Sequence, residues 1–117
     1  MKKLKWSISI LIFVVILTPV FCLADIADQL NQAAMENNIQ MVNDLIAKGA
    51  DVNAKSHYGL TDLYVAIWNG NTEVVKILIK KGADVNEKSD NGETALSIAQ
   101  SKNHSEIIQL LMQAGAK

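Results

Sequence analysis

The sequence predicts an all-α solenoid of about three tandem helix-turn-helix units. The first observation is a period of 33 residues, which separates Gly49, Gly82 and Gly115. The second is that apolar residues recur at helical spacing between these glycines, as on the buried side of an amphipathic helix. A unit of this size cannot bury its apolar side alone, so stacking of neighbouring units must supply the core.

The same period runs through the apolar and small residues of the body. It relates the three sets Leu30, Leu63, Leu96; Ala33, Ala66, Ala99; and Leu45, Leu78, Leu111. The segment Lys-Gly-Ala-Asp-Val-Asn also occurs twice, at 48–53 and 81–86. Because alanine is small, we expect the first helices of neighbouring units to approach closely at the alanine positions.

The middle unit shows the elements that each unit is expected to contain. Thr61 suits the N-cap of a first helix, because its hydroxyl can accept from a free backbone N–H. Asn69-Gly70 ends that helix, and a second helix runs from Thr72 to a stop at Gly82. The turn-forming residues of 83–92 predict an extended, hairpin-like connection to the next unit.

The segments Gly59-Leu60-Thr61-Asp62-Leu63 and Lys81-Gly82-Ala83-Asp84-Val85-Asn86 resemble the ankyrin repeat. The resemblance implies an ankyrin-repeat domain over 25–117, with units at about 25–56, 57–89 and 90–117. The chain departs from the family pattern where a Pro and a His are usual: Asp62 and Tyr64 stand there. The missing inter-repeat hydrogen bonds should cost about 1 kcal/mol per junction.

The first 24 residues have the order of a signal peptide. Lysines at positions 2, 3 and 5 precede the apolar stretch 7–17, and small residues at 22 and 24 precede Asp25. We expect cleavage after Ala24 and a periplasmic or secreted product. Two alternatives stay open: the segment could remain as a membrane anchor, or Cys22 could be lipidated, although bulky Phe21 disfavours lipidation.

Composition excludes several classes of function. Three of the 11 basic residues are the lysines of the signal segment (the leader), so residues 25–117 contain 8 basic residues, all lysine, and 12 acidic ones. The resulting net charge of 8 − 12 = −4 disfavours nucleic-acid binding. The single cysteine allows no intrachain disulfide. The two histidines, His57 and His104, match no metal or catalytic motif. We therefore expect no enzyme activity, no metal and no cofactor.

The resemblance implies that a partner protein contacts the connection tips and the concave side of the first helices. An apolar centre with a polar margin is expected there, since hot spots favour Trp and Tyr within such a rim. Trp68 could instead cover its own helix pair, Leu60 could seal a repeat junction, and Tyr64 is expected to pack between repeats. The expected site comprises Met35, His57, Tyr58, Leu60, Trp68, Asn69, Asp90, Glu93 and Lys102.

These observations predict a monomeric protein-binding module exported to a bacterial envelope, where it holds, protects or neutralises a partner protein. Two alternatives remain: a secreted effector that binds a protein of another cell, or a scaffold tethered to the membrane by an uncleaved leader. Membrane contact is expected only through the signal segment, if this segment is not cleaved.

Overall fold

The computed structural model describes residues 26–57 and 59–117. Helices occupy residues 26–35, α2 (Ile39–Ala47), α3 (Asp62–Trp68), α4 (Thr72–Lys80), α5 (Ala95–Ser101) and α6 (Ser105–Gln113). The expected signal-peptide helix and cleavage site lie outside the described residues. Within the described part of the chain, no helix combines the length and apolar character needed to span a bilayer.

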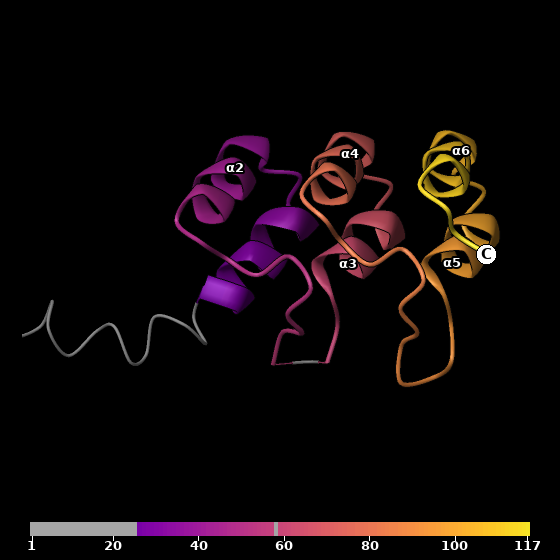
Figure 1. Ribbon diagram of the computed structural model, residues 1–117, viewed down its shortest axis with the longest axis horizontal. Helices are drawn as coiled ribbons and strands as arrows, with labels where there is room; N and C mark the ends of the chain where they lie inside the picture. The colour runs from indigo at the N-terminus through magenta and orange to yellow at the C-terminus, as the bar shows by residue number, and fades with distance from the viewer. Residues whose placement is uncertain (1–25, 58) are drawn as a thin grey trace, which may run out of the picture.

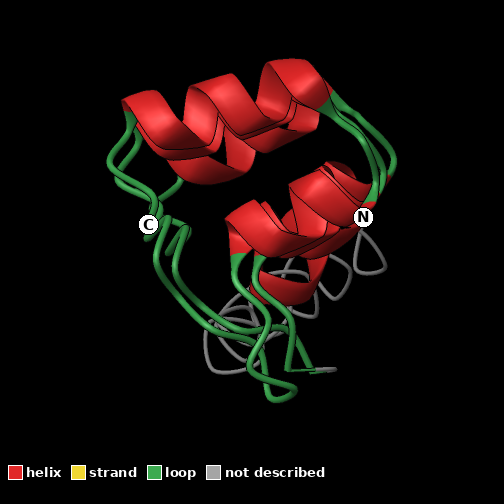
Figure 2. Ribbon diagram, turned by 90° about the vertical axis from the view of Figure 1, so that its right-hand side faces the viewer, coloured by secondary structure: helices red, strands yellow, loops and turns green. Residues whose placement is uncertain are grey.

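The helices form two layers of a solenoid (Figures 1 and 2). The second helices of the units, α2, α4 and α6, form one layer, and helix 26–35, α3 and α5 form the other. α3 packs on its partner α4 and on the equivalent helix α5 of the next unit, and α4 packs on α2 and α6. The predicted all-α solenoid is confirmed.

The periodic residues form the core, as the sequence predicts. Ala33, Ala66 and Ala99 are completely buried where the first helices meet. Leucines of the second helices, such as Leu78 and Leu111, fill the space between the layers. The continuous cluster of buried apolar side chains shows that each unit completes its core with its neighbours.

The helix ends follow the expected capping chemistry. The Thr61 hydroxyl accepts from the backbone N–H of Tyr64 (3.4 Å), and the Thr94 hydroxyl accepts from that of Ser97 (3.2 Å). Gly70 has a φ of +71°, and a Cβ there would lie 2.8 Å from Cε1 of His104. Backbone conformation therefore favours glycine at residue 70, and the neighbouring ring leaves no room for a Cβ there.

The connections are hairpin-like, as expected. Isolated antiparallel bridges join Lys55 to Thr61 and Lys88 to Thr94, again 33 residues apart. At the start of the second connection, the Asp84 carboxylate accepts from the N–H of Asn86 (2.9 Å). Within residues 26–57 and 59–117, bridges of this kind are the only strand-like pairing.

Asparagine side chains tie neighbouring units together. The Asn53 amide donates to the carbonyl of Gly82 (3.1 Å) and its oxygen accepts from the N–H of Asp84 (2.7 Å). Asn86 repeats the arrangement with Gly115 (3.3 Å) and Lys117 (3.0 Å). Both tied asparagines belong to the duplicated segment, so the sequence repeat is also a repeat of inter-unit hydrogen bonds.

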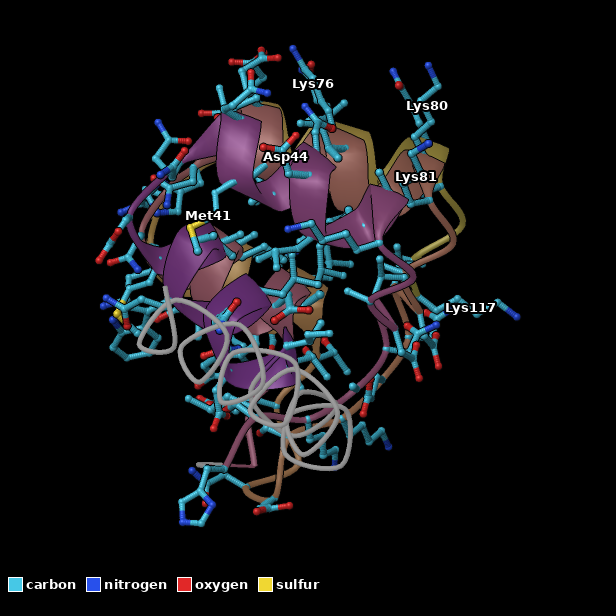
Figure 3. The ribbon with its side chains drawn as sticks, turned by 90° about the vertical axis from the view of Figure 1, so that its left-hand side faces the viewer. Met41, Asp44, Lys76, Lys80, Lys81 and Lys117 are labelled. Carbon is cyan, nitrogen blue, oxygen red and sulfur yellow. The ribbon has the colours of Figure 1, made fainter. Side chains whose placement is uncertain are left out.

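Charged side chains cover the outer layer. Lys76 and Lys80 project outward from α4 (Figure 3). The Lys76 ammonium lies 3.1 Å from Glu73 on its own helix and 3.5 Å from Glu106 on α6. Because these groups are exposed, the pairs contribute little to stability, and this layer is a solvated surface.

Candidate functional site

An apolar groove opens on the side of the stack formed by the first helices and the connections. Its volume is about 420 Å³, which is within the range of small ligand pockets. Met35 and Trp68, at equivalent positions of two units, are 45% and 48% exposed. We call this groove the apolar chamber; it is lined by Met35, Leu60, Tyr64, Val65, Trp68 and Asn69.

The ring of Trp68 is held from two sides. Tyr64 precedes it by one helical turn, and the two rings stack with centroids 6.1 Å apart and planes at 11°. The Lys102 ammonium lies 3.7 Å from the centroid of the Trp68 ring, a cation–π contact from the next unit. Trp68 thus makes intramolecular contacts and still presents about half of its surface to solvent.

Leu60 closes a repeat junction and also lines the apolar chamber. Its carbonyl accepts from the N–H of Ser56 (2.9 Å) and from the Asn31 amide of the preceding unit (3.3 Å), so its backbone closes a junction. Its half-buried side chain packs on the core and lines the apolar chamber. Residue 60 therefore anchors one wall of the groove to the stack.

A second groove of about 410 Å³ adjoins the first, and most of the residues that line it are polar. We call it the polar chamber; it is lined by Asp28, Gln29, Asn31, Gln32, Met35, Ser56 and His57. Met35 lines both chambers. The Asp28 carboxylate accepts from the backbone N–H of His57 (2.8 Å), which fixes the connection against helix 26–35.

Asp28 and His57 meet at the polar chamber. Asp28 lies near the start of helix 26–35, and its carboxylate binds the backbone of the next connection. His57, one of the expected site residues, lines the polar chamber rather than the apolar chamber, because Asp28 holds its backbone there.

Most of the expected polar margin surrounds the apolar chamber. Glu93 accepts from the Tyr64 hydroxyl (3.2 Å), and burial together with this carboxylate raises the pKa of Tyr64. The Asn69 amide donates to the carbonyl of Val65 (3.1 Å). Asp90 lies instead at the connection tips, close to Gly59 of the preceding connection. A Cβ added to Gly59 would lie 3.2 Å from the Asp90 carboxylate. Tyr58 lies outside the described residues.

A buried carboxyl group lies behind the groove, at the first junction. Asp62 is 1% exposed and accepts from the Asn31 amide (3.2 Å), while its other oxygen has no hydrogen-bond partner among the described residues. Burial raises the pKa of Asp62 to about 7; the bond from Asn31 opposes this rise, and the charge of Asp51 adds to it. With no route to solvent, this group belongs to the junction rather than to a reactive site.

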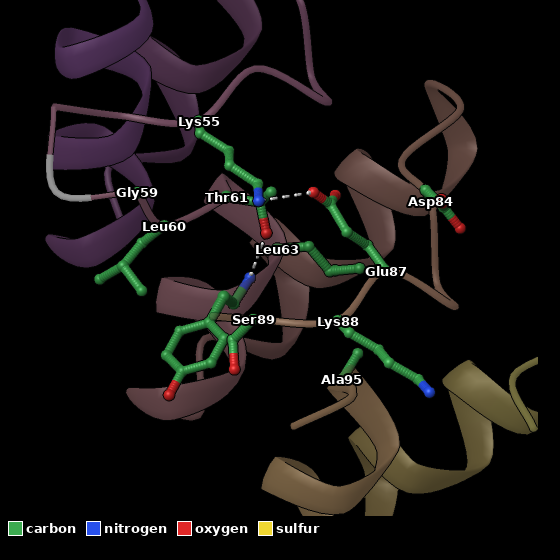
Figure 4. Close-up of a pocket in the computed structure, with 11 residues that line it drawn as sticks. Lys55, Gly59, Leu60, Thr61, Leu63, Asp84, Glu87, Lys88, Ser89 and Ala95 are labelled. Carbon is green, nitrogen blue, oxygen red and sulfur yellow. Dashed lines mark hydrogen bonds and ion pairs between the residues drawn. The ribbon is translucent and has the colours of Figure 1, made fainter. Parts of the chain in front are cut away.

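The other cavities are less suited to binding. Figure 4 shows the one between the two connections, crossed by the ion pair of Lys55 and Glu87 (3.7 Å); with about 20 Å³ it has room for about one water. A shallow groove of about 250 Å³ lies between α4 and α6, with Lys76 and Lys80 in its lining. Among the described residues no three His, Cys, Asp or Glu side chains are grouped to hold a metal.

Sequence reasoning missed two groups of groove residues. Tyr64 was assigned to inter-repeat packing, and it does reach Glu93, but its ring also lines the apolar chamber. Its spacing of four from Trp68 was the available signal. Asp28 and Gln32 of the polar chamber were missed, because the expected site included only Met35 from the first unit.

The comparisons with known proteins agree with this architecture. A family model described as ankyrin repeats, in three copies, matches residues 30–117. No curated protein matches the chain. The match covers most of the sequence and includes all the labelled helices. The chain therefore belongs to the ankyrin-repeat family, whose repeats are protein–protein interaction modules and typically have no catalytic activity.

Proposed function

We propose that this protein is exported to the cell envelope and binds a partner protein through the apolar chamber. The observation that carries the proposal is the grouping of half-exposed Met35 and Trp68 with Leu60 and Tyr64 around one groove. Large apolar side chains that gather on the surface of a small protein are typical of an interface.

The geometry favours Trp68 as the anchor of that interface. Its ring is already oriented by Tyr64 and Lys102, so little side-chain freedom is lost when a partner covers it. Glu93, Asn69 and Lys102 form a polar rim around the chamber. An ordered aromatic within a polar rim is the arrangement in which hot spots occur.

Photocrosslinking in the producing cell tests the surface. A benzophenone amino acid at position 35 should form an adduct with the partner, and the same group at position 112, which is exposed on α6 and lines neither chamber, should not. Trp68→Ser introduces the residue found at the equivalent position, Ser101, and should abolish the adduct at 35.

Affinity for the recovered partner gives the second readout. Trp68→Ser should weaken binding by at least ~2 kcal/mol, about 30-fold, as expected for a hot-spot tryptophan. Met112→Ser, the control variant, should bind like the wild type. Adducts that form only from position 112, or that persist in Trp68→Ser, would exclude the chamber as the interface.

The proposal of export rests on the order of charged, apolar and small residues in 1–24. Mass spectrometry of the protein from the producing cell should find Asp25 as its first residue. A mature chain that retains the leader would support a tethered scaffold instead. Recovery from the medium rather than the periplasm would favour a secreted effector that binds a protein of another cell.

A further inference from the structure

The two chambers form one bipartite groove, because Met35 lines both. A chain that crosses Met35 can place one side chain in each chamber. The two volumes, about 420 and 410 Å³, are each sufficient for a large side chain. The chambers differ in chemistry: aromatic and aliphatic groups line the first, and a carboxylate and several amides line the second.

The charge beside the polar chamber is negative. Asp28 and Gln32 lie on one side of helix 26–35, and Glu36 follows at the same spacing of four. The Gln32 amide donates to Glu36 (2.5 Å), so this carboxylate is held next to the chamber. Asp28, Gln32 and Glu36 are all exposed.

Positive charge is scarce along the groove. Among the described residues no lysine lines either chamber, and the Lys102 ammonium lies over the ring of Trp68 on the apolar side. On the far side of the apolar chamber Glu93 adds a further carboxylate. The net charge of −4 over 25–117 acts in the same direction at longer range.

We propose that the bipartite groove recognises a basic segment of the partner protein, with a large apolar side chain in the apolar chamber and a Lys or Arg side chain in the polar chamber. This inference rests on the proposed function and adds the chemistry of the partner. The exposed carboxylates of Asp28 and Glu36 receive the cation, and complementary charge selects the segment and its direction. An acidic segment is rejected by the same carboxylates.

Selection of displayed random peptides on the purified protein tests the inference without knowledge of the partner. Peptides that bind the Trp68→Ser variant are first removed from the library, and peptides that bind the wild type are then selected. The peptides that remain therefore depend on the apolar chamber. These peptides should combine a Trp, Phe, Tyr or Leu with at least one Lys or Arg.

Charge variants then locate the contact. Asp28→Asn with Glu36→Gln removes two charges but keeps an oxygen acceptor for His57 and for Gln32, and should weaken the selected peptides about three- to tenfold. Asp44→Asn with Glu73→Gln makes the same change of net charge on the outer layer and should leave affinity unchanged.

The outcomes separate the two proposals. Trp68-dependent peptides that lack basic residues, or that weaken equally in both double variants, overturn this inference and leave the proposed function standing. If no recovered peptide depends on Trp68, both the inference and the proposed interface are overturned.

Discussion

At the scale of single residues, Asp62 is the most unusual member of the fold. It occupies the first position of α3, where the family pattern has proline, and its carboxyl group is buried against Asn31. Burial of a charge is unfavourable, so the group is stabilised in its protonated form and its pKa rises to about 7.

This buried carboxyl should make stability depend on pH. The unfolded carboxyl releases its proton near 3.8 and the folded one near 7, so the folded chain binds more protons between these values. Stability should therefore fall as pH rises through this range, by up to about 4 kcal/mol. Urea unfolding of the wild type at pH 5 and pH 8 measures the larger part of this change, about 3 kcal/mol.

Asp62→Asn is the matched variant, because it keeps an acceptor for Asn31 and cannot ionise. Its unfolding free energy should lack this fall between pH 5 and pH 8, and it should exceed that of the wild type at pH 8. Parallel pH profiles for the two proteins would show that Asp62 is already ionised in the folded chain.

At the scale of elements, the turn between the two helices of a unit depends on the next unit. Asn37, Gly70 and Asn103 are equivalent, and all three have a positive φ. At Gly70 the His104 ring of the next unit lies against the backbone, so a side chain there would both strain the backbone and meet another unit.

Gly70→Ala should therefore destabilise the protein more than Gly82→Ala. Gly82 also has a positive φ (+96°), but a Cβ there meets nothing within 4 Å. We expect roughly 1 kcal/mol for Gly82→Ala, from backbone conformation alone, and about 2–4 kcal/mol for Gly70→Ala, where a clash is added. Thermal unfolding followed by circular dichroism compares them, and equal losses would mean that the His104 ring moves aside without penalty.

At the scale of the whole molecule, the core is one continuous cluster that extends along the stack from unit to unit. α3 packs on α5, and α4 packs on both α2 and α6, so the middle unit is supported from both sides. Stability in such a stack is approximately a sum over units and their interfaces. Three units are about the minimum for a stable stack.

Removal of 95–117 should thus abolish cooperative unfolding, because buried Ile67 and Leu78 of the middle unit would lose their neighbours. Removal of 114–117 alone is the control: it deletes the ties of Asn86 to Gly115 and Lys117 and should cost only about 1–3 kcal/mol. Circular dichroism during urea unfolding compares the two truncated proteins with the full-length chain. A two-unit chain with the full-length midpoint would contradict the additive stack.

Much of the fold could be predicted because its signals are local or periodic. The caps at Thr61 and Thr94, the stop at Gly70 and the hairpin-like connections each depend on residues a few positions apart. The buried alanines follow from the period of 33. Grouping of Met35, Leu60 and Trp68 at one groove was also expected, since equivalent positions of stacked units must share a side.

Only the tertiary structure decided how side chains from different units meet. The burial of Asp62 by Asn31, the reach of Tyr64 to Glu93 and the position of Lys102 over Trp68 all join residues about 30 positions apart. Such contacts depend on the lateral offset between units, which the repeat length does not encode. The sequence by itself determined the repeating backbone and its core; packing between units decided the two chambers and the state of the buried carboxyl.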